Sequence, residues 1–310
     1  MTLPPCRLSA LEPAPTVTAA TDSAPGTQAT ATAVYVAYRT PWIDLDHVPH
    51  DVDVVVVHND DAWEGPRHHD GVVHHVSAPF NVGFGAGVNL ALPVVTGDRT
   101  ILVNPDTRLD AEHWAALVDA APDEVITIPL VDARGSPTSA VNRYPDAMAC
   151  VLMGYRVGRL LARGGQARRL AATLLFSRGR EHNRSLQMTA GRWALSRHWA
   201  SAAVLSVDSK RLQSIGGFSP DYFLYMEDVD LCRRLAERYP EMVVCMPATR
   251  PAVHAVGGSA QDSTSRRAVE IHRLRSTLRY CMATRPRGWK LGSLLLRARL
   301  AVLTAAIRRQ

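Results

Sequence analysis

The sequence predicts an α/β fold in which a mostly parallel sheet is flanked by helices on both faces. The run Val52–His58 is almost wholly apolar and rich in β-branched residues, which is typical of a parallel strand buried on both faces. Similar runs at 32–38, 99–106 and 124–131 alternate with segments of helical pattern. Ligands of such sheets bind beyond the carboxyl ends of the strands, so polar residues at those ends are the first candidates for a site.

Helices are expected between and after these strands. Residues 85–95 follow a glycine-rich stretch and have the length of a short helix. Residues 110–121 form a second helix, for which Asp110 is a suitable N-cap. A third helix is expected to begin at Glu227, within the segment "DYFLYMEDVDLCRRL".

The 310-residue chain is expected to have three parts. Residues 1–30, rich in Ala, Thr and Pro and without periodicity, are expected to form a disordered tail. Residues 31–265 are expected to form the α/β domain, with a first half at 31–132 and a second half at 133–265. Residues 266–310 are expected to form basic amphipathic helices.

The composition favours a cytoplasmic protein. The chain has no uninterrupted apolar run of about 18 residues, which a membrane span requires, and its N-terminus lacks the pattern of a signal peptide. The five cysteines are scattered and contain no CxxC, so we expect reduced thiols and neither a disulfide framework nor a zinc site.

The net charge of +6 is unevenly distributed. Residues 155–198 contain ten arginines and one acid, and residues 266–310 contain twelve Lys or Arg and one acid. Such patches favour an anionic partner: phospholipid, a diphosphate-linked acceptor or nucleic acid. The alternative is two solvated arginine-rich helix faces.

The last segment, 289–309, has Leu, Val and Ile at near-helical spacing with arginines between them. This pattern predicts an amphipathic helix at an anionic membrane surface. The alternative is a terminal helix that packs on the same chain or on a second subunit of a homodimer. A nucleic-acid partner is not expected, because no RRM, helix-turn-helix or zinc-finger pattern is present and few aromatic residues lie among the arginines.

Two motifs at predicted strand ends suit a phosphorylated ligand. "NVGFGAG" at 81–87 has glycines that permit close backbone approach to a ligand, although a structural turn explains it equally well. "NPD" ends an apolar strand, where Asp106 is a candidate ligand of a divalent cation and Asn104 a second oxygen donor. Ordinary turn chemistry is the alternative for this tripeptide.

Three carboxylates, Glu227, Asp228 and Asp230, fall within four residues after an aromatic stretch. Acidic side chains are rarely buried unless they are paired, liganded or used in chemistry. In a helix that begins at Glu227, Glu227 and Asp230 share one side and Asp228 points elsewhere. Pairing with Arg233 and Arg234 one turn later accounts for one or two of these acids.

The order of the motifs carries more information than any one of them. NxGxG, NPD about twenty residues later, GGF with "YMEDVDL", and then H-x2-GGS resemble the family 2 glycosyltransferases of the GT-A fold. The resemblance covers about residues 32–265 and is most specific at ED-x-D with its upstream GGF. Within the family, the chain is similar to bacterial rhamnosyltransferase-type enzymes of cell-wall and surface polysaccharide synthesis.

The resemblance implies roles for particular residues. Asp106 and His254 would hold the divalent metal, Mn²⁺ or Mg²⁺, on the diphosphate of a nucleotide sugar. Asp228 would be the catalytic base. Beside it, we expect Glu227 to bind the acceptor or to orient Arg233, which also faces the acceptor. The nucleotide sugar would lie against Tyr38, Asn59, Asp60, Asn81, Gly83, Gly85 and Asn104.

One departure from the family concerns recognition of the nucleotide base. The second strand of the family usually ends in Asp-Asn, and that Asp helps to hold the base, whereas this chain has His58-Asn59. Either Asp60 substitutes for the missing aspartate or a different nucleotide is preferred. The first strand ends in Ala37-Tyr38-Arg39 in place of the usual Asn-Tyr-Asn.

One base and one metal imply a single displacement with inversion at the anomeric carbon. The resemblance implies that rhamnose is transferred from dTDP-rhamnose to a hydroxyl of an acceptor linked to a polyprenyl diphosphate, at the inner face of the cell membrane. UDP-galactofuranose and GDP-mannose are alternative donors. A catalytically inactive scaffold that binds a nucleotide sugar is the remaining alternative.

Overall fold

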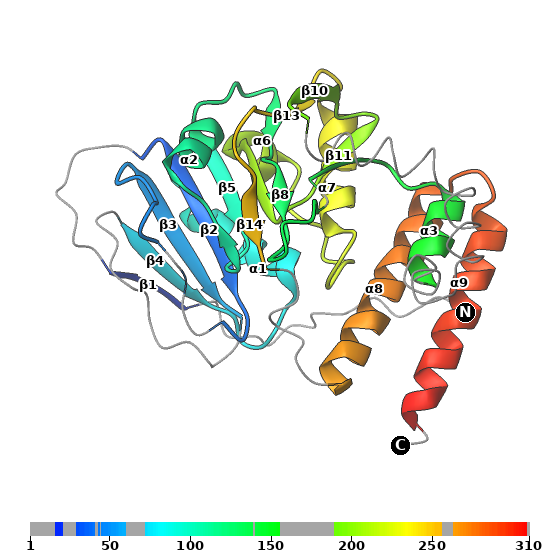
Figure 1. Ribbon diagram of the computed structural model, residues 1–310. Coiled ribbons are helices and arrows are strands. Elements are labelled where there is room, and N and C mark those ends of the chain that lie inside the picture. Colours follow the sequence, from blue (N-terminus) through cyan, green and yellow to red (C-terminus); the bar gives the residue numbers. More distant parts are fainter. Residues whose placement is uncertain are drawn as a thin grey trace.

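The computed structural model describes residues 16–20, 29–40, 43, 45–59, 72–138, 140–155, 189–255 and 263–308. Its centre is a nine-stranded sheet in the order β1-β4-β3-β2-β5-β12-β7-β13-β10 (Figure 1). The strands are β1 (Thr16–Ala20), β2 (Ala31–Ala37), β3 (Val52–His58), β4 (Val73–Ser77), β5 (Arg99–Val103), β7 (Glu124–Ile126), β10 (Gly191–Ala194), β12 (Val204–Asp208) and β13 (Val243–Met246). Strands β1, β10 and β12 run against the other six, so the predicted mostly parallel sheet is confirmed.

The central strands are buried on both faces, as their apolar sequences predicted. All seven residues of β2 are buried, and Val54–Val57 of β3 are completely inaccessible. Alternate residues of the two strands enter two separate cores. Val34 and Val55 belong to one core, and Tyr35 and Val54 belong to the other.

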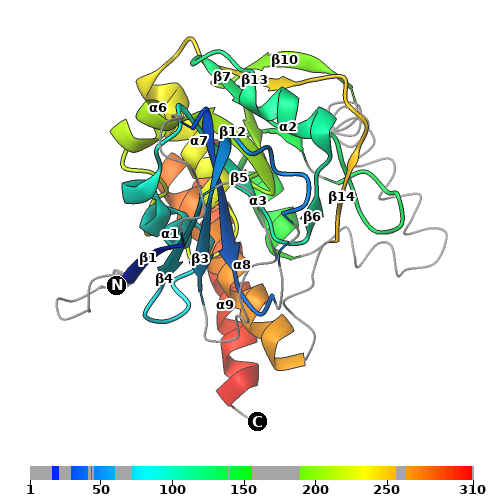
Figure 2. The ribbon, with the colours of Figure 1, turned by 90° about the vertical axis from the view of Figure 1, so that its left-hand side faces the viewer.

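Helices cover both faces of this sheet (Figure 2). One core receives α1 (Phe84–Ala91), α6 (Ser209–Ser214) and α7 (Glu227–Arg238). The opposite core receives Trp114 and Leu117 of α2 (Ala111–Val118). Asp110 caps α2 as predicted, because its side chain accepts a hydrogen bond from the backbone N–H of His113.

The remaining short elements lie outside the nine-stranded sheet. They are η1 (Leu92–Val94), β6 (Thr107–Arg108), β8 (Leu130–Val131), β14 (Ala252–His254), β9 (Val141–Arg143) and β11 (His198–Ala200).

Three helices form a separate layer beside the sheet (Figure 1). They are α3 (Ala147–Gly154), α8 (Ser263–Thr284) and α9 (Trp289–Arg308). A third apolar core lies among them, and α3 and α9 approach closely at Gly154, where an added Cβ would lie 2.3 Å from the side chain of Leu296. The helices predicted at the C-terminus are thus present. Within the described residues, none of the helices is long and apolar enough to cross a membrane.

The structure differs from the expected disordered tail at Thr16–Ala20, which forms β1. This strand pairs antiparallel with β4, with Thr16 opposite Ser77. The sequence TVTAA is rich in β-branched residues, and its pairing satisfies the backbone groups that β4 would otherwise leave open at the edge of the sheet. Most of the basic segment at 155–198 lies outside the described residues, because the description resumes only at residue 189.

Candidate functional site

The carboxyl ends of three neighbouring parallel strands meet at one edge of the sheet. Tyr38 follows β2, Asn59 follows β3 and Asn104 follows β5. The chain passes from β2 to β3 on one side and returns to β5 on the other, so the strand order reverses at β2. Ligands of open α/β sheets bind at such a reversal, which makes this edge the candidate site.

Asn59 fixes the glycine-rich loop that follows β4. Its side chain is buried and accepts a hydrogen bond from the backbone N–H of Val82 at 2.9 Å. The same amide donates to the Asn81 side chain and to the Gly83 carbonyl, at 3.1 and 3.3 Å. Asn81 in turn accepts from the Gly83 N–H at 3.0 Å. Both asparagines, predicted to contact the nucleotide sugar, therefore shape the loop in this structure.

The glycines of this loop permit close contact with the segment that precedes the acidic helix. Gly83 has φ +88°, and a Cβ there would lie 2.2 Å from the carbonyl oxygen of Phe223. A Cβ on Gly85 would lie 2.8 Å from the side chain of Phe218. The backbone N–H of Phe84 donates to the same Phe223 carbonyl at 3.2 Å. The candidate donor loop and the segment at 218–226 therefore form one packed unit.

Asn104, Asp106 and His254 come together although about 150 residues separate the first from the last. His254 ends β14, which pairs antiparallel with β6 directly after Asp106. Its Nε2 lies 3.2 Å from Asp106 Oδ1 and 3.2 Å from Asn104 Nδ2. Asp106 is one-third exposed and His254 is mostly buried, so this group opens toward solvent through the carboxylate.

The chemistry of this group fits a divalent cation. Two ligand atoms that each lie about 2.1 Å from an octahedral metal ion, on neighbouring corners, are about 3 Å apart. The 3.2 Å between Asp106 Oδ1 and His254 Nε2 is close to this separation. Among the described residues, no cluster of three His, Cys, Asp or Glu side chains is arranged to hold a metal. A two-ligand set suits Mg²⁺ or Mn²⁺, which usually take only one or two protein ligands and fill the remaining positions with water and substrate phosphate.

The helix α7 begins in a strained backbone. Tyr225 and Met226 both have positive φ, 66° and 68°, a conformation that non-glycine residues rarely adopt and that costs on the order of 1–3 kcal/mol per residue. The turn buries Glu227, whose Oε2 has no hydrogen-bond partner within the described structure. It also brings Asp228 beneath the backbone of a neighbouring loop, and such strain is typical of functional sites.

Burial changes the protonation of both acids. Burial raises the pKa of Asp228 to about 6, although hydrogen bonds from the backbone N–H groups of Val229 and Ala202 favour its charged form. Burial, and then the charge of Asp228, raise the pKa of Glu227 well above its usual value. Asp228 is therefore the acid of this pair that ionises first, near neutral pH, as a general base requires.

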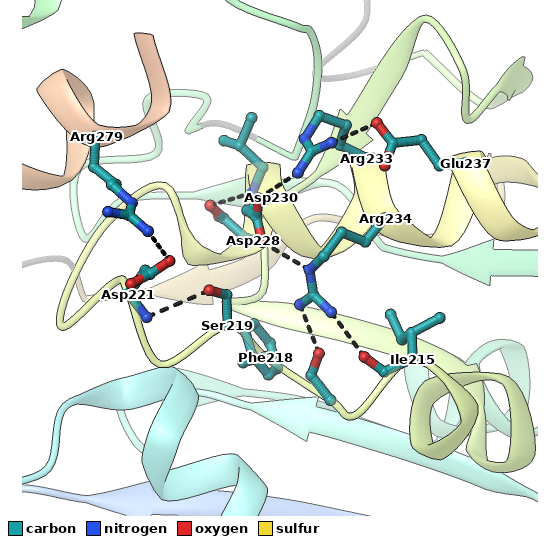
Figure 3. Close-up of polar contacts among 12 residues, drawn as sticks. Ile215, Phe218, Ser219, Asp221, Asp228, Asp230, Arg233, Arg234, Glu237 and Arg279 are labelled. Carbon is teal, nitrogen blue, oxygen red and sulfur yellow. Dashed lines mark hydrogen bonds and ion pairs between the residues drawn. The ribbon is translucent and has the colours of Figure 1, made fainter. Parts of the chain in front are cut away.

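Asp230 is held in an ion-pair network (Figure 3). It accepts hydrogen bonds from Arg233 at 2.9 Å and from Arg234 at 2.8 Å, which confirms the predicted pairing within the helix. Arg234 continues to the carbonyl groups of Ile215 and Gly217 and so anchors the Gly-Gly turn. The guanidinium of Arg233 pairs with Asp230 and Glu237, not with Glu227 as one prediction proposed.

One short stretch of backbone joins the acidic pair to the candidate metal ligands. The N–H of Ala202 is hydrogen-bonded to Asp228, and the carbonyl of Ala203 accepts from the N–H of Asn104 at 2.9 Å. Asp228 and Asn104 are thus tethered to consecutive residues of the same loop. The candidate base and the candidate metal ligands lie at the same edge of the sheet.

Two further positions from the sequence analysis, Tyr38 and His58, lie at strand ends. Tyr38 follows β2 and lies under the guanidinium of Arg39, 5.4 Å from its ring centroid. His58 Nε2 lies 2.9 Å from Nδ1 of His75 on β4. Asp60 lies outside the described residues, as do the two glycines after His254.

The sequence analysis missed residues that act through the backbone or across long separations. Asn89 accepts from the N–H of Phe218 and donates to its carbonyl, both at 2.8 Å, and so holds GGF against α1. Asn89 is a polar residue in the otherwise apolar helix α1, and this was the only sign in the sequence that it has such a role. Helix α8 holds the loop before Glu227 through Ser276, which donates to the Leu224 carbonyl at 2.8 Å.

Two further contacts from α8 reach the same loop. His272 stacks on Phe223 with ring centroids 4.2 Å apart. Arg279 pairs with Asp221 (Figure 3). The sequence pattern gave no indication of these contacts between α8 and the loop, because the residues that form them lie about 50 positions apart in the chain.

Comparisons with known proteins agree with the motif-based prediction. The chain is 27% identical over 251 residues to N-acetylglucosaminyl-diphospho-decaprenol L-rhamnosyltransferase from two strains of Mycobacterium tuberculosis, CDC 1551 / Oshkosh and ATCC 25618 / H37Rv. The alignment covers 74% of this chain and 75% of each relative. The predicted resemblance to rhamnosyltransferase-type glycosyltransferases is thereby confirmed. No protein-family model matches the chain.

Solved structures show more distant likenesses. The mannosyltransferase PcManGT from Pyrobaculum calidifontis, in complex with GDP-Man and Mn²⁺, is 15% identical, with 93% of this chain and 77% of that chain covered and a TM-score of 0.46. TarS of S. aureus in complex with UDP-GlcNAc is 13% identical, with coverages of 80% and 70% and a TM-score of 0.42. Both TM-scores are low, so these likenesses support no statement about function.

Proposed function

We propose that the protein is an inverting glycosyltransferase that moves rhamnose from dTDP-rhamnose to a lipid-linked acceptor. The convergence of two groups at one edge of the sheet carries this proposal. Asp228, whose pKa burial raises to about 6, is hydrogen-bonded to the backbone of Ala202, and the backbone N–H of Asn104 donates to the carbonyl of Ala203. His254 lies 3.2 Å from both Asn104 and Asp106, so the candidate metal pair is linked to this loop through Asn104. The similarity to the mycobacterial rhamnosyltransferase supports the sugar and, through that relative's name, an acceptor with GlcNAc on a polyprenyl diphosphate.

Asp228 acts as the general base of this reaction. It takes the proton of the acceptor hydroxyl as the oxygen forms its bond to the anomeric carbon. The bond from that carbon to the diphosphate oxygen breaks, and the nucleoside diphosphate leaves with the electron pair. Attack opposite the leaving group inverts the anomeric carbon, and the proton on Asp228 later passes to water. Positioned base catalysis of this kind typically contributes 10²–10⁴-fold.

The other residues bind and orient. Asp106 and His254 would hold the divalent cation, Mn²⁺ or Mg²⁺, which would supply positive charge to stabilise the diphosphate leaving group. The loop fixed by Asn59 borders the donor. We assign Glu227, which is buried beside Asp228, to the acceptor side, where burial raises the pKa of its carboxyl. We place the reaction at the cytoplasmic face of the membrane, where a polyprenyl-linked acceptor is anchored.

Nucleotide binding tests the donor half of this proposal. The unfolding temperature of the purified protein is measured with dTDP, UDP and GDP, each with Mn²⁺ or with EDTA. Binding to the folded state raises the midpoint by mass action, so dTDP with Mn²⁺ should give the largest rise. Asp106→Asn should remove the Mn²⁺-dependent part of that rise, whereas Asp132→Asn, on an exposed turn after β8, is the matched control.

Each alternative has its own outcome in the same experiment. A rise with UDP or GDP alone would favour galactofuranose or mannose as the donor sugar. A rise with dTDP and Mn²⁺ but no transfer to any acceptor would favour an inactive scaffold. No rise with any nucleotide would contradict a donor site at this edge of the sheet.

A further inference from the structure

The outward face of α9 is apolar, although it is exposed. Leu291, Leu294 and Val302 expose 64, 63 and 62% of their surface, and Leu295 exposes 38%. These four residues, which we call the α9 face, follow the spacing i, i+3, i+4 and i+11 and therefore lie along one side of the helix. Single exposed leucines are ordinary, but a continuous apolar row indicates an interaction surface.

The opposite side of α9 is also apolar. Leu296 is completely buried in the core shared with α3 and α8, and Leu300 and Leu303 pack against that core. A helix at the surface of a globular protein normally has a polar outer side, whereas a helix that is apolar all round is covered on both sides. In the part of the chain that the structure describes, the α9 face therefore lacks a covering layer.

Cationic side chains surround the α9 face. Lys290 and Arg297 are exposed on the same helix. Residues 271–310 contain ten Lys or Arg and no Asp or Glu. A second copy of the chain docked through the same face would bring two surfaces of equal charge together. An anionic lipid surface offers both an apolar interior for the leucines and negative head groups for the cations.

We propose that the α9 face docks the protein on an anionic bilayer, with Leu291, Leu294 and Val302 inserted into the lipid and Lys290 and Arg297 on the head groups. The helix lies in the plane of the membrane. This geometry deepens the proposed function, because α8 packs on α9 and contacts the loop before Asp228 through Ser276. Docking thus brings the candidate base close to a surface that holds a lipid-linked acceptor.

Vesicle binding tests this inference without donor, acceptor or turnover, so it can fail independently of the proposed reaction. The full chain is sedimented with vesicles of phosphatidylcholine, with and without phosphatidylglycerol, at low and high salt. We expect binding to the anionic vesicles that weakens with salt. Absence of binding by the wild-type protein would overturn the inference.

Two variants separate the apolar and the charged contributions. Leu291→Gln, Leu294→Gln and Val302→Gln combined should weaken binding by about tenfold or more, because the side chains no longer gain from insertion. Lys290→Glu with Arg297→Glu should remove the preference for anionic vesicles. Arg134→Glu, on the exposed turn after β8, is the control for a change of charge and should bind like the wild-type protein.

Two checks keep the result interpretable. Circular dichroism should give the same unfolding temperature for all variants, since the substituted side chains are exposed in the fold. Light scattering measures the mass of the protein in solution. A dimer that the triple glutamine variant dissociates, together with unchanged sedimentation of that variant with vesicles, would contradict the inference and assign the α9 face to a second copy.

Discussion

At the scale of single residues, the candidate site depends on positions where close packing leaves no room for a side chain. Gly83 is the clearest example, because it combines a positive φ with contact against the Phe223 carbonyl. The sequence indicated a close backbone approach at this loop, and the structure shows that the approaching group is another part of the chain. The glycine thereby couples the candidate donor loop to the candidate catalytic segment.

Gly83→Ala should destabilise the protein far more than an ordinary substitution of glycine. A positive φ alone costs about 1–2 kcal/mol for a residue with a Cβ, and here the Cβ would also displace the Phe223 backbone. We expect a total loss of about 3 kcal/mol in the free energy of unfolding, measured with urea. Gly135→Ala is the matched control, because Gly135 also has positive φ but no atom lies near its added Cβ. Equal losses for both variants would show that the contact with Phe223 is unimportant.

The acidic pair makes a prediction about pH. The value of kcat/KM should rise as pH increases through about 6, because Asp228 accepts a proton only in its ionised form. Glu227→Gln should retain the midpoint and activity within about threefold, since a neutral amide resembles the protonated acid. A loss of 10²-fold or more in this variant would instead give Glu227 a direct part in proton transfer.

The same raised pKa implies a cost to folding. Because burial raises the pKa of Asp228 from its ordinary value of 3.8 to about 6 in the folded protein, ionisation opposes folding above about pH 4, and the cost is complete above about pH 6. Asp228→Asn should therefore be more stable than the wild-type protein at pH 8, by on the order of 2 kcal/mol. The difference should disappear below pH 4, and denaturation at both pH values measures it. A less stable variant at pH 8 would contradict the burial of an ionised Asp228.

At the scale of elements, α8 supports the start of α7. The loop that precedes α7 has two consecutive residues with positive φ, and α8 contacts it at Leu224, Phe223 and Asp221. Strained backbone persists only where surrounding structure determines it. We therefore infer that helix α8 supports the turn that positions Asp228.

Ser276→Ala should reduce kcat several-fold while KM for the donor stays within about twofold, because the lost hydrogen bond frees the loop that positions the base. The free energy of unfolding should fall by only about 1 kcal/mol. Thr284→Ala is the control, since that hydroxyl bonds to a carbonyl of its own helix. Equal kinetic constants for both variants would restrict Ser276 to a structural role.

The elements also show what could be predicted from sequence. The buried strand Val52–His58, the cap at Asp110 and the start of α7 at Glu227 followed from local pattern, and the structure has them at those residues. Strand β1 and the short strand β14 depend on partners distant in the chain, and the β-branched residues of β1 do not by themselves identify β4 as its partner. The pairing of Asp106 with His254 was expected only through the family resemblance.

At the scale of the whole molecule, the fold brings three regions of the sequence to one place. The sheet supplies the candidate metal ligands, α7 supplies the candidate base, and α9 supplies the apolar face that we propose docks on a membrane. The central claim is that these parts perform a single displacement with Asp228 as the base. Stereochemistry and the loss of Asp228 test that claim together.

The most direct measurement is an NMR analysis of the product formed from dTDP-rhamnose and a polyprenyl-diphosphate-linked GlcNAc acceptor with Mn²⁺. Reactions contain either the wild-type protein or Asp228→Asn. We predict a rhamnoside whose anomeric configuration is opposite to that of the donor, formed at least about a hundredfold more slowly by the variant. A product with retained configuration, or a variant that keeps more than about a tenth of the wild-type turnover, would contradict the account.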